Sequence, residues 1–442
     1  MRGILAKNLL WKLTKKISNL NFSIVILLSI AFLSILGTII EQNQTLEYYQ
    51  EKYPLINGSI LEVNWLTINS FGLDHIYDNW WFLLLLFIFF LSLISCTLSR
   101  QLPSLKYSRN WKFIKSSKRS LSKIDSTKFH KQPLSNIIYS INRDKFFVFH
   151  QGHKIYAYKG LIGRIAPIFV HISIIITILG CLLGLLCGFT AQEIVPKNEF
   201  FHIKNIIKVG RLASLPNQIV GKVDKFWIEY NKDKSIKQFF SSISIVDNEC
   251  INITQKEIAV NQPLIVKGIS FYQTNWEINA LRLNIGNKYK IQQVVSKKNI
   301  DGKNIWISPI PIDEQNYLFF AVYNLQDKII IYNNQGSLIQ EVSIYEKIYV
   351  NKVPISVDEI MTSTGLQIKT DPGIPLVYTG FLILMLTTII SYISYSQIWV
   401  YANSKNSRFI GSTNRSVLSF EKDFIYIYKS YNKSINSKYK SY

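Results

Sequence analysis

The sequence contains few cysteines and no cysteine motif. Cys96, Cys181, Cys187 and Cys250 are the four cysteines in its 442 residues, and no two of them form a C-x-x-C pair. The chain therefore cannot itself be a thioredoxin-like dithiol reductase, and without C-x-x-C-H it is not itself a c-type cytochrome. A phosphate-binding glycine loop, a zinc-ligand spacing and a nucleophile elbow are also missing, so no common signature of nucleotide, zinc or hydrolase chemistry is present.

Charged residues are absent from four long apolar segments, at 22–40, 80–98, 166–189 and 374–396. Each is close to the roughly 20 residues that an α-helix needs to cross about 30 Å of hydrocarbon. The first segment is too long for the apolar part of a signal peptide, and no small-residue cleavage site follows it. We therefore predict a polytopic α-helical membrane protein with four transmembrane helices.

Basic residues are distributed unevenly between the connecting segments. The segment 99–165 contains fifteen Lys and Arg against two Asp, whereas 41–79 contains one Lys against six acidic residues. Lys and Arg in short loops stay on the cytoplasmic side of a membrane. We therefore predict that 99–165 and both termini, 1–21 and 397–442, lie on one side, which we call the inner side. The loop 41–79 and the long segment 190–373 then lie on the outer side.

The formal net charge of +22 does not require nucleic acid as a partner. Most of the surplus lies in the inner loop and the tails, where it agrees with the topology and with binding to anionic membrane lipid. We therefore predict no nucleic-acid binding. The tail 397–442 is rich in Lys, Ser, Asn and Tyr, which predicts a solvated and partly disordered segment.

The outer segment 190–373 alternates short runs rich in Val, Ile, Phe and Tyr with turn signals, which predicts a large β-rich sandwich. The predicted strands are 223–230, 239–246, 264–272, 281–285, 289–295, 317–323 and 328–332. Residues 332–336 between two runs predict a hairpin turn, because Asn and Gly accept a positive φ. With Cys250 as its only cysteine, the domain does not depend on an internal disulfide, and a bridge to Cys187 is conceivable but not expected.

The third apolar segment carries two further patterns. Gly180, Gly184 and Gly188 recur every four residues, a spacing that lets two helix backbones approach closely and so predicts a packing surface. Pro167 suits the first turn of the helix, and His171 then lies about 6 to 10 Å into it. A titratable ring in an apolar span is costly, so His171 is either an axial ligand or proton carrier, or a histidine hydrogen-bonded to a neighbouring helix.

Longer strings of the sequence resemble the ResB-like family of System II cytochrome c biogenesis proteins, of plastid type. They are the first span with its ending GTIIEQ, GRIAPIFVH at 163–171, VNQPL at 260–264 with FYQTNW at 271–276, and TGLQIKTDPGIP at 364–375. The resemblance covers nearly all of 10–400 and includes the arrangement of three spans, an outer domain and a fourth span. Only the two ends of the chain lie outside it.

The resemblance implies a role in the covalent attachment of haem to apocytochromes c on the outer side. The chain would act with the partner CcsA, which carries a tryptophan-rich haem-handling motif that is absent here, as a haem delivery and cytochrome c synthetase complex. It would be a non-catalytic subunit of this haem lyase rather than an enzyme alone. The resemblance also implies that His171 is an axial ligand of a transiently bound haem b that enters from the inner side, with no other metal site and no catalytic residue.

The heavy use of Ile, Lys, Asn, Tyr and Phe is typical of an A/T-rich genome, and no Ser- and Arg-rich transit sequence precedes the first span. This favours a plastid-encoded protein of the thylakoid membrane, with stromal termini, a lumenal domain, and cytochrome f and soluble c-type cytochromes as clients. A bacterial inner-membrane protein is the second interpretation. Two other function classes stay open, a membrane sensor and a transporter permease, each with an extracytoplasmic ligand-binding domain.

Overall fold

The computed structural model describes residues 14–55, 64–103, 113, 124–125, 134–216, 219–233, 235–246, 252–286, 288–300, 303–312, 316–326, 328–350, 352–402 and 407–439. Two compact units are present. The first, which we call the membrane unit, includes Met1–Leu179 and Pro375–Tyr442. The second, which we call the β unit, includes Gly180–Ile374.

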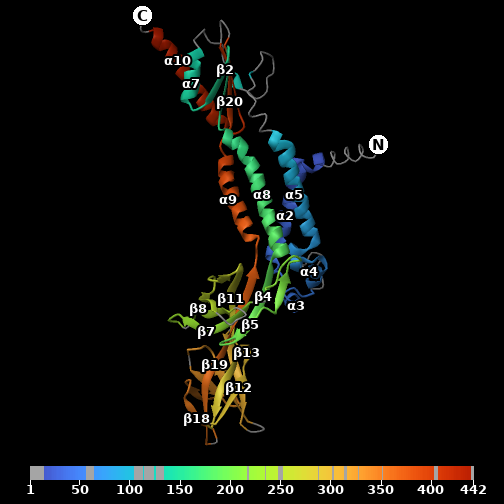
Figure 1. Cartoon of the computed structure of the whole chain (residues 1–442), viewed down its shortest axis with the longest axis vertical. Coiled ribbons are helices and arrows are strands. Elements are labelled where there is room, and N and C mark those ends of the chain that lie inside the picture. The colour runs from blue at the N-terminus through green and yellow to red at the C-terminus, as the bar shows by residue number, and fades with distance from the viewer. Residues whose placement is uncertain are drawn as a thin grey trace, which may run out of the picture. The chain divides into compact units, whose positions relative to one another are not determined.

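Four helices of the described chain are long and apolar enough to cross a membrane, as predicted (Figure 1). They are α2 (Leu20–Ile39), α5 (Trp80–Cys96), α8 (Leu161–Cys187) and α9 (Ile374–Ser391). Only 6% to 28% of the residues in their most apolar windows are buried inside the protein. Most of their apolar side chains therefore face outward, which lipid favours and water does not.

The helix α8 begins earlier than the sequence predicts, at Leu161 rather than 166. Pro167 therefore lies inside the helix and not in its first turn. Because proline has no N–H, the carbonyl of Gly163 lacks the donor that an α-helix normally supplies. His171 comes ten residues after the helix start, about 15 Å along the axis rather than the 6 to 10 Å that the sequence predicts.

The membrane helices alternate in direction within the membrane unit. Ser23 near the start of α2 lies 2.7 Å, hydroxyl to hydroxyl, from Ser92 near the end of α5. A Cβ atom at Gly163, in the first turn of α8, would overlap the carbonyl oxygen of Ile393, just after α9. Thr97, just after α5, contacts His171 in the first half of α8. The starts of α2 and α8 therefore lie at the same end as the last residues of α5 and α9, which we call the inner end.

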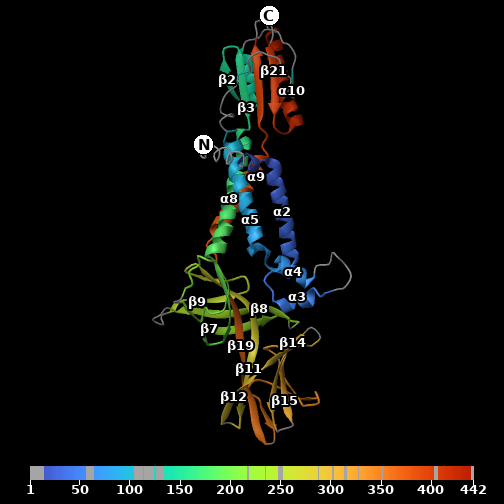
Figure 2. The same ribbon diagram turned by 90° about the vertical axis from the view of Figure 1, so that its right-hand side faces the viewer.

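Segments from two distant parts of the chain form one small α/β domain in the membrane unit (Figure 2). Its antiparallel sheet has the order β1-β21-β20-β3-β2. The strands are β1 (Ile124–Asp125), β2 (Phe147–Gln151), β3 (Lys154–Lys159), β20 (Ser396–Ala402) and β21 (Ser407–Thr413). Two helices, α7 (Leu134–Arg143) and α10 (Val417–Tyr439), pack in one core with this sheet. We call it the inner domain.

The prediction of a solvated and partly disordered tail at 397–442 was wrong for its described residues. They form β20, β21 and α10, and β20 pairs with β3 from Ser396↔Lys159 to Tyr401↔Lys154. In α10, buried side chains recur every three or four residues at Phe420, Phe424, Ile427 and Tyr431. This is the period of one helix face, and the many intervening Lys, Ser and Asn residues lower the average hydrophobicity without removing that face.

We expect Ile427→Ala to destabilise the inner domain by about 2–5 kcal/mol, because the side chain is only 1% exposed and its removal leaves a cavity. Ile425→Ala is the matched control, since Ile425 lies two residues away on α10 and is 50% exposed. Thermal unfolding of the full-length protein in detergent, together with protease cleavage within 397–442, measures both variants. Equal destabilisation by the two substitutions would contradict this packing.

The β unit consists of three antiparallel sheets, which confirms the predicted β-rich domain between the third and fourth membrane helices (Figure 1). The seven-stranded sheet contains β4 (Phe189–Pro196), β6 (Ile206–Val209), β10 (Leu264–Val266), β11 (Ile269–Ile285), β12 (Tyr289–Val294), β18 (Lys347–Val350) and β19 (Val353–Thr370). The four-stranded sheet contains β5 (Phe200–His202), β7 (Val220–Tyr230), β8 (Ile236–Val246) and β9 (Asn252–Ala259). The five-stranded sheet contains β13 (Ser296–Ile300), β14 (Lys303–Pro311), β15 (Tyr317–Val322), β16 (Ile329–Tyr332) and β17 (Leu338–Val342).

Two long paired strands, β11 and β19, give the β unit two cores instead of one. Their pairing runs from Ser270↔Lys369 to Ile285↔Ile355, with three irregularities in register along the way. One part of this ribbon packs on the four-stranded sheet around Phe271. The other part packs on the five-stranded sheet around Leu283. Because bulges bend and twist a strand, the same ribbon can serve two sheets, and the predicted sandwich is a double one.

Trp276 lies between the two cores. Its ring stacks on Phe226 with centroids 6.0 Å apart and lies 5.1 Å from the ring of Trp306. Phe226 belongs to β7 and Trp306 to β14, so this tryptophan contacts both partner sheets. Aromatic pairs of this kind add to the burial of apolar area, so Trp276 helps to fix the two halves of the unit.

The predicted strands agree with the structure except where turns and long strands were missed. The predicted run 264–272 is divided into β10 and β11 by a turn at Lys267 and Gly268, both with positive φ. The predicted hairpin between β16 and β17 is confirmed. Asn333 Oδ1 accepts hydrogen bonds from the N–H groups of Gln335 (3.0 Å) and Ser337 (2.9 Å), and Gly336 has a φ of 77°.

The glycine spacing in α8 forms a packing surface, as predicted, and a segment of the same chain occupies it. A Cβ atom at Gly373 would overlap the carbonyl of Gly180 and crowd the backbone nitrogen of Gly184 at 2.8 Å. Similarly, a Cβ atom at Gly188 would lie 2.8 Å from the carbonyl oxygen of Thr370. The residues before α9 therefore cross α8 backbone to backbone, a contact that only glycine permits.

Candidate functional site

His171, the one site residue predicted from the sequence, lies on α8 beside the end of α5. Its Nδ1 atom is 3.2 Å from the Oγ1 atom of Thr97. Thr97 is buried, with 8% of its surface exposed, and is the first residue of η2 (Thr97–Gln101), a single π-helical turn that continues α5. Such turns often occur at functional positions of helices, and here one coincides with the contact to His171.

The hydrogen bonds of Thr97 determine which nitrogen of His171 carries the proton. The Thr97 hydroxyl donates to the carbonyl of Leu93 at 2.7 Å, one turn earlier on α5. A hydroxyl has a single proton, so towards His171 it acts as the acceptor and Nδ1–H is the donor. The neutral ring then carries its lone pair on Nε2, the form in which imidazole binds a metal.

Besides the contact of Nδ1 with Thr97, the His171 ring has a hydrogen bond to the backbone of Leu93, also near the end of α5. The helix surface that follows His171 is apolar, because Ile174, Ile175 and Ile178 pack with Leu93 of α5. Across the described residues, no three His, Cys, Asp or Glu side chains lie close enough to hold a metal ion. A single histidine in apolar surroundings suits a planar apolar ligand that supplies the other ligands of its own metal.

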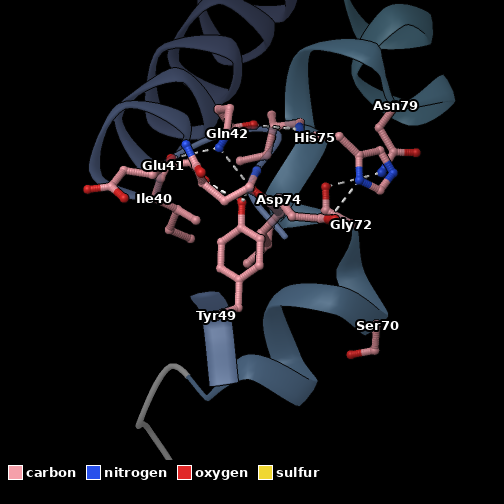
Figure 3. A network of polar contacts seen from close by, with 12 residues as sticks. Ile40, Glu41, Gln42, Tyr49, Ser70, Gly72, Asp74, His75 and Asn79 are labelled. Carbon is pink, nitrogen blue, oxygen red and sulfur yellow. Dashed lines mark hydrogen bonds and ion pairs between the residues drawn. The ribbon is translucent and has the colours of Figure 1, made fainter. Parts of the chain in front are cut away.

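A polar network joins the outer ends of α2 and α5 (Figure 3). The Gln42 amide nitrogen donates to the carbonyls of Ile40 (2.8 Å) and Leu73 (3.0 Å), and its oxygen accepts from the N–H of Ile76 (3.0 Å). Leu73 and Ile76 belong to η1 (Leu73–Asp78), which follows α3 (Leu46–Lys52) and α4 (Trp65–Phe71). Because Gln42 bonds through both the nitrogen and the oxygen of its amide, it ties the end of α2 to η1, which precedes α5.

An acid–base pair lies in the same network, with His75 Nδ1 2.7 Å from Asp74 Oδ1 (Figure 3). The side chain of His75 is 46% exposed. Neither His75 nor Thr97 was singled out from the sequence. A threonine at the end of an apolar run and a histidine in an outer loop have no distinctive spacing, so only the fold shows what they contact.

The cysteines contribute no paired site in the described part of the chain. Cys96, Cys181 and Cys187 are free thiols. Cys250 lies outside the described residues. The bridge between Cys187 and Cys250, which the sequence left conceivable, therefore involves a residue outside the described part of the chain.

Comparison with known proteins gives the chain clear relatives over nearly its whole length. The model of the ResB-like family matches residues 20–329 and 317–425. The cytochrome c biogenesis protein Ccs1 of Gracilaria tenuistipitata var. liui is 50% identical over 428 residues, which is 96% of this chain and 98% of that protein. Ccs1 of Porphyra purpurea is 44% identical over 95% of this chain and 96% of that protein.

A cyanobacterial relative extends the comparison beyond algae. The cytochrome c biogenesis protein CcsB of Picosynechococcus sp. is 38% identical over 416 residues, which is 93% of this chain and 90% of that protein. The matched residues include all four membrane helices and the β unit. The chain therefore belongs to the ResB-like family.

Proposed function

We propose that this chain acts in the biogenesis of c-type cytochromes at the step of haem attachment, as a subunit of a complex with CcsA. In this complex it delivers and orients haem b, and CcsA with its tryptophan-rich motif completes the synthetase. The names of the relatives support the general role, and their occurrence in algae and a cyanobacterium supports the thylakoid membrane as the location. The inner end then faces the stroma and the β unit the lumen, in agreement with the charge distribution.

The observation that carries this proposal is the hydrogen bond between His171 and Thr97. It leaves the Nε2 lone pair of His171 available next to apolar side chains, and it holds the ring in one tautomer. The axial ligand of a transported haem has to meet the same two conditions.

The proposed roles follow from the positions of the residues along the helices. The apolar faces of the helices provide a route for a hydrophobic cargo, and His171 orients its iron. Haem, when bound, supplies the vinyl groups that react with the thiols of the apocytochrome. The β unit, which follows α8 directly in the chain, provides the surface that holds the unfolded apocytochrome near this reaction.

Co-expression of the chain with CcsA, followed by purification and an absorption spectrum, tests the proposed function. We expect a stable complex with a Soret band typical of histidine-ligated haem, and a weaker band or none from either chain alone. A complex that forms without bound haem, or no complex at all, would contradict the proposal. A sensor or a permease would show neither the complex nor the band.

We propose that the apocytochrome segment, such as that of cytochrome f, binds as an added strand along β17. This strand is at the edge of the five-stranded sheet, and its Leu338 and Ile339 side chains are 58% and 53% exposed. Edge strands bind extended peptides through their free backbone groups. Apolar side chains on such an edge are otherwise a liability for a soluble domain.

Fluorescence anisotropy of a labelled peptide containing C-x-x-C-H, titrated with the full-length protein, tests this edge. We expect Leu338→Lys to weaken binding at least severalfold, because a charge on an edge strand opposes strand addition. Ile265→Lys is the matched control, because Ile265 lies on β10, an edge strand of the seven-stranded sheet, and is 65% exposed against 58% for Leu338. Failure of the peptide to bind at high micromolar protein, or equal loss in both variants, would exclude β17 as the site.

A further inference from the structure

A polar cavity lies at the inner end of α8 and α9, within the membrane unit. Its volume is about 330 Å³, and its lining residues are Arg164, Tyr395, Gln397, Ser412, Thr413 and Asn414. Arg164 comes from the first turn of α8, while the others lie in or beside β20 and β21 of the inner domain. The cavity therefore joins a membrane helix to the inner domain, and all of its named lining groups are polar.

Arg164 has no anionic partner in the described chain. Its guanidinium lies over the ring of Tyr395, 4.9 Å from the centroid, and makes no hydrogen bond or ion pair with any described residue. Nearby basic groups differ in this respect. Lys159 pairs with Asp423 at 3.2 Å, and Arg415 donates to the carbonyl of Ser391 at 2.9 Å.

An unpaired, half-buried guanidinium is unusual, because buried charges are normally paired. Its planar set of N–H donors matches two oxygens of a carboxylate or a phosphate. The Ser412 hydroxyl and the side-chain amide of Asn414 add further polar groups to the same cavity, whereas the Thr413 hydroxyl donates to the carbonyl of Arg415 at 2.6 Å. The cavity therefore has the chemistry of an oxyanion site.

Hydrogen bonds surround Tyr395, the ring over which the Arg164 guanidinium lies. The hydroxyl groups of Tyr395 and Tyr156 are 3.1 Å apart, and the Gln397 amide lies 2.7 Å from Tyr156 and 2.8 Å from Tyr395. Asn414 Oδ1 accepts a hydrogen bond from the N–H of Tyr395 at 2.8 Å. These bonds hold Tyr395 in place, so the position of Arg164 over its ring is also defined.

Two glycines bring Tyr395 close to the start of α8. A Cβ atom at Gly160 would overlap the carbonyl of Ser394, and one at Gly163 would overlap the carbonyl of Ile393. Gly160 also has a φ of 76°, which favours glycine. These two glycines therefore allow the residues after α9 to approach the Arg164 guanidinium.

Arg164 and His171 lie on the same face of α8. They are seven residues apart, which corresponds to a rise of about 10 Å and a rotation about 20° short of two full turns. This rise is comparable to the distance between the iron of a haem and its propionate carboxylates. A haem held by the Nε2 atom of His171 would therefore have its acidic edge towards Arg164.

We propose that Arg164 and the cavity around it bind the propionate carboxylates of the haem whose iron is held by His171. This inference rests on the proposed function, because it takes haem as the cargo. The contact with Arg164 would orient the haem in the membrane, with its carboxylates at the inner end and its vinyl groups pointing away from that end. A phospholipid phosphate offers similar oxygens, and the experiment below separates the two sources.

The test compares iron protoporphyrin IX with its dimethyl ester, in which the carboxylates are uncharged. The complex of the full-length protein with CcsA, in neutral-lipid nanodiscs, is titrated with each compound, and the Soret band gives the dissociation constant. We expect the free acid to bind at least about tenfold more tightly than the ester in the wild type, as for a charge-assisted hydrogen bond. In Arg164→Gln this preference should disappear, with the position of the Soret band unchanged because His171 is intact.

Two further variants and one anionic lipid complete the test. Arg164→Lys should retain part of the preference, whereas Arg100→Gln, which removes an exposed charge at the end of α5, should retain all of it. Equal binding of acid and ester by a wild type with a histidine-dependent band would overturn this inference and leave the proposed function standing. If neither compound binds, both are overturned. Native mass spectrometry measures bound phosphatidylglycerol. If Arg164→Gln loses only this lipid and keeps its preference for the free acid, the cavity is a lipid site and the inference is wrong.

Discussion

His171→Ala is expected to abolish the haem absorption band of the complex with CcsA while the two chains still purify together. The substitution removes the only described side chain on this part of α8 that can bind iron, and its replacement is small enough for α5 and α8 to keep their packing. The measurement is the Soret absorbance per mole of complex, with imidazole added to the variant in a second sample. Recovery of the band by imidazole would assign the loss to the missing ligand.

Thr97→Val provides a graded version of the same experiment. Valine has nearly the shape of threonine but cannot accept the Nδ1–H bond, so His171 keeps its position and loses its orientation. We expect haem affinity to fall about 10- to 100-fold, the usual effect of removing a group that orients a metal-binding histidine. Thr67→Val, in the outer helix α4, is the control. A full band in both His171→Ala and Thr97→Val would return His171 to a packing role.

Gly373→Val is expected to disrupt the packing of the residues before α9 on the glycine face of α8. Backbone atoms of Gly180 and Gly184 occupy the space that a side chain at this position would need, and backbone cannot move aside as a flexible side chain can. Overpacking of this kind costs of the order of 3 kcal/mol, a large part of the stability of a domain. We expect a much lower yield of folded protein and an earlier unfolding transition.

Leu376→Val is the control for Gly373→Val, because it changes a neighbouring residue that is 38% exposed on α9 and contributes to the lipid-facing surface. Size-exclusion chromatography in detergent and thermal unfolding compare the two variants with the wild type. A stable, monodisperse Gly373→Val protein would show that the residues before α9 do not cross α8 in contact with Gly180.

Local signals in the sequence were sufficient where one residue type repeats with a regular period. The four uncharged runs predict the membrane helices, because the cost of burying a charge in lipid applies to every residue of a span. The hairpin at Asn333 and Gly336 was predicted because positive φ angles have a local cause. Likewise, the spacing of Gly180, Gly184 and Gly188 predicts close packing without showing which segment packs there.

Local signals failed where the partner is distant in the chain. In α10 the apolar positions Phe420, Phe424, Ile427 and Tyr431 are separated by Lys, Ser and Asn, so the composition resembles a disordered tail. Their partners come from α7, β3 and β20, in part more than 250 residues earlier. The length of α8 was also underestimated, since Arg164 and Pro167 resemble a helix start unless the inner domain before them is known.

By itself the sequence determined the class of this protein, its four membrane helices, a β-rich domain between the last two, and His171 as the residue to test. These depend on hydrophobic period, charge and family strings, all of which are properties of single segments. Only the tertiary structure decided that Thr97 contacts His171, that Arg164 lines a polar cavity with no anionic partner among the described residues, and that the two inner segments form one domain. Each of these depends on distances between segments far apart in the chain, and such distances are set by packing.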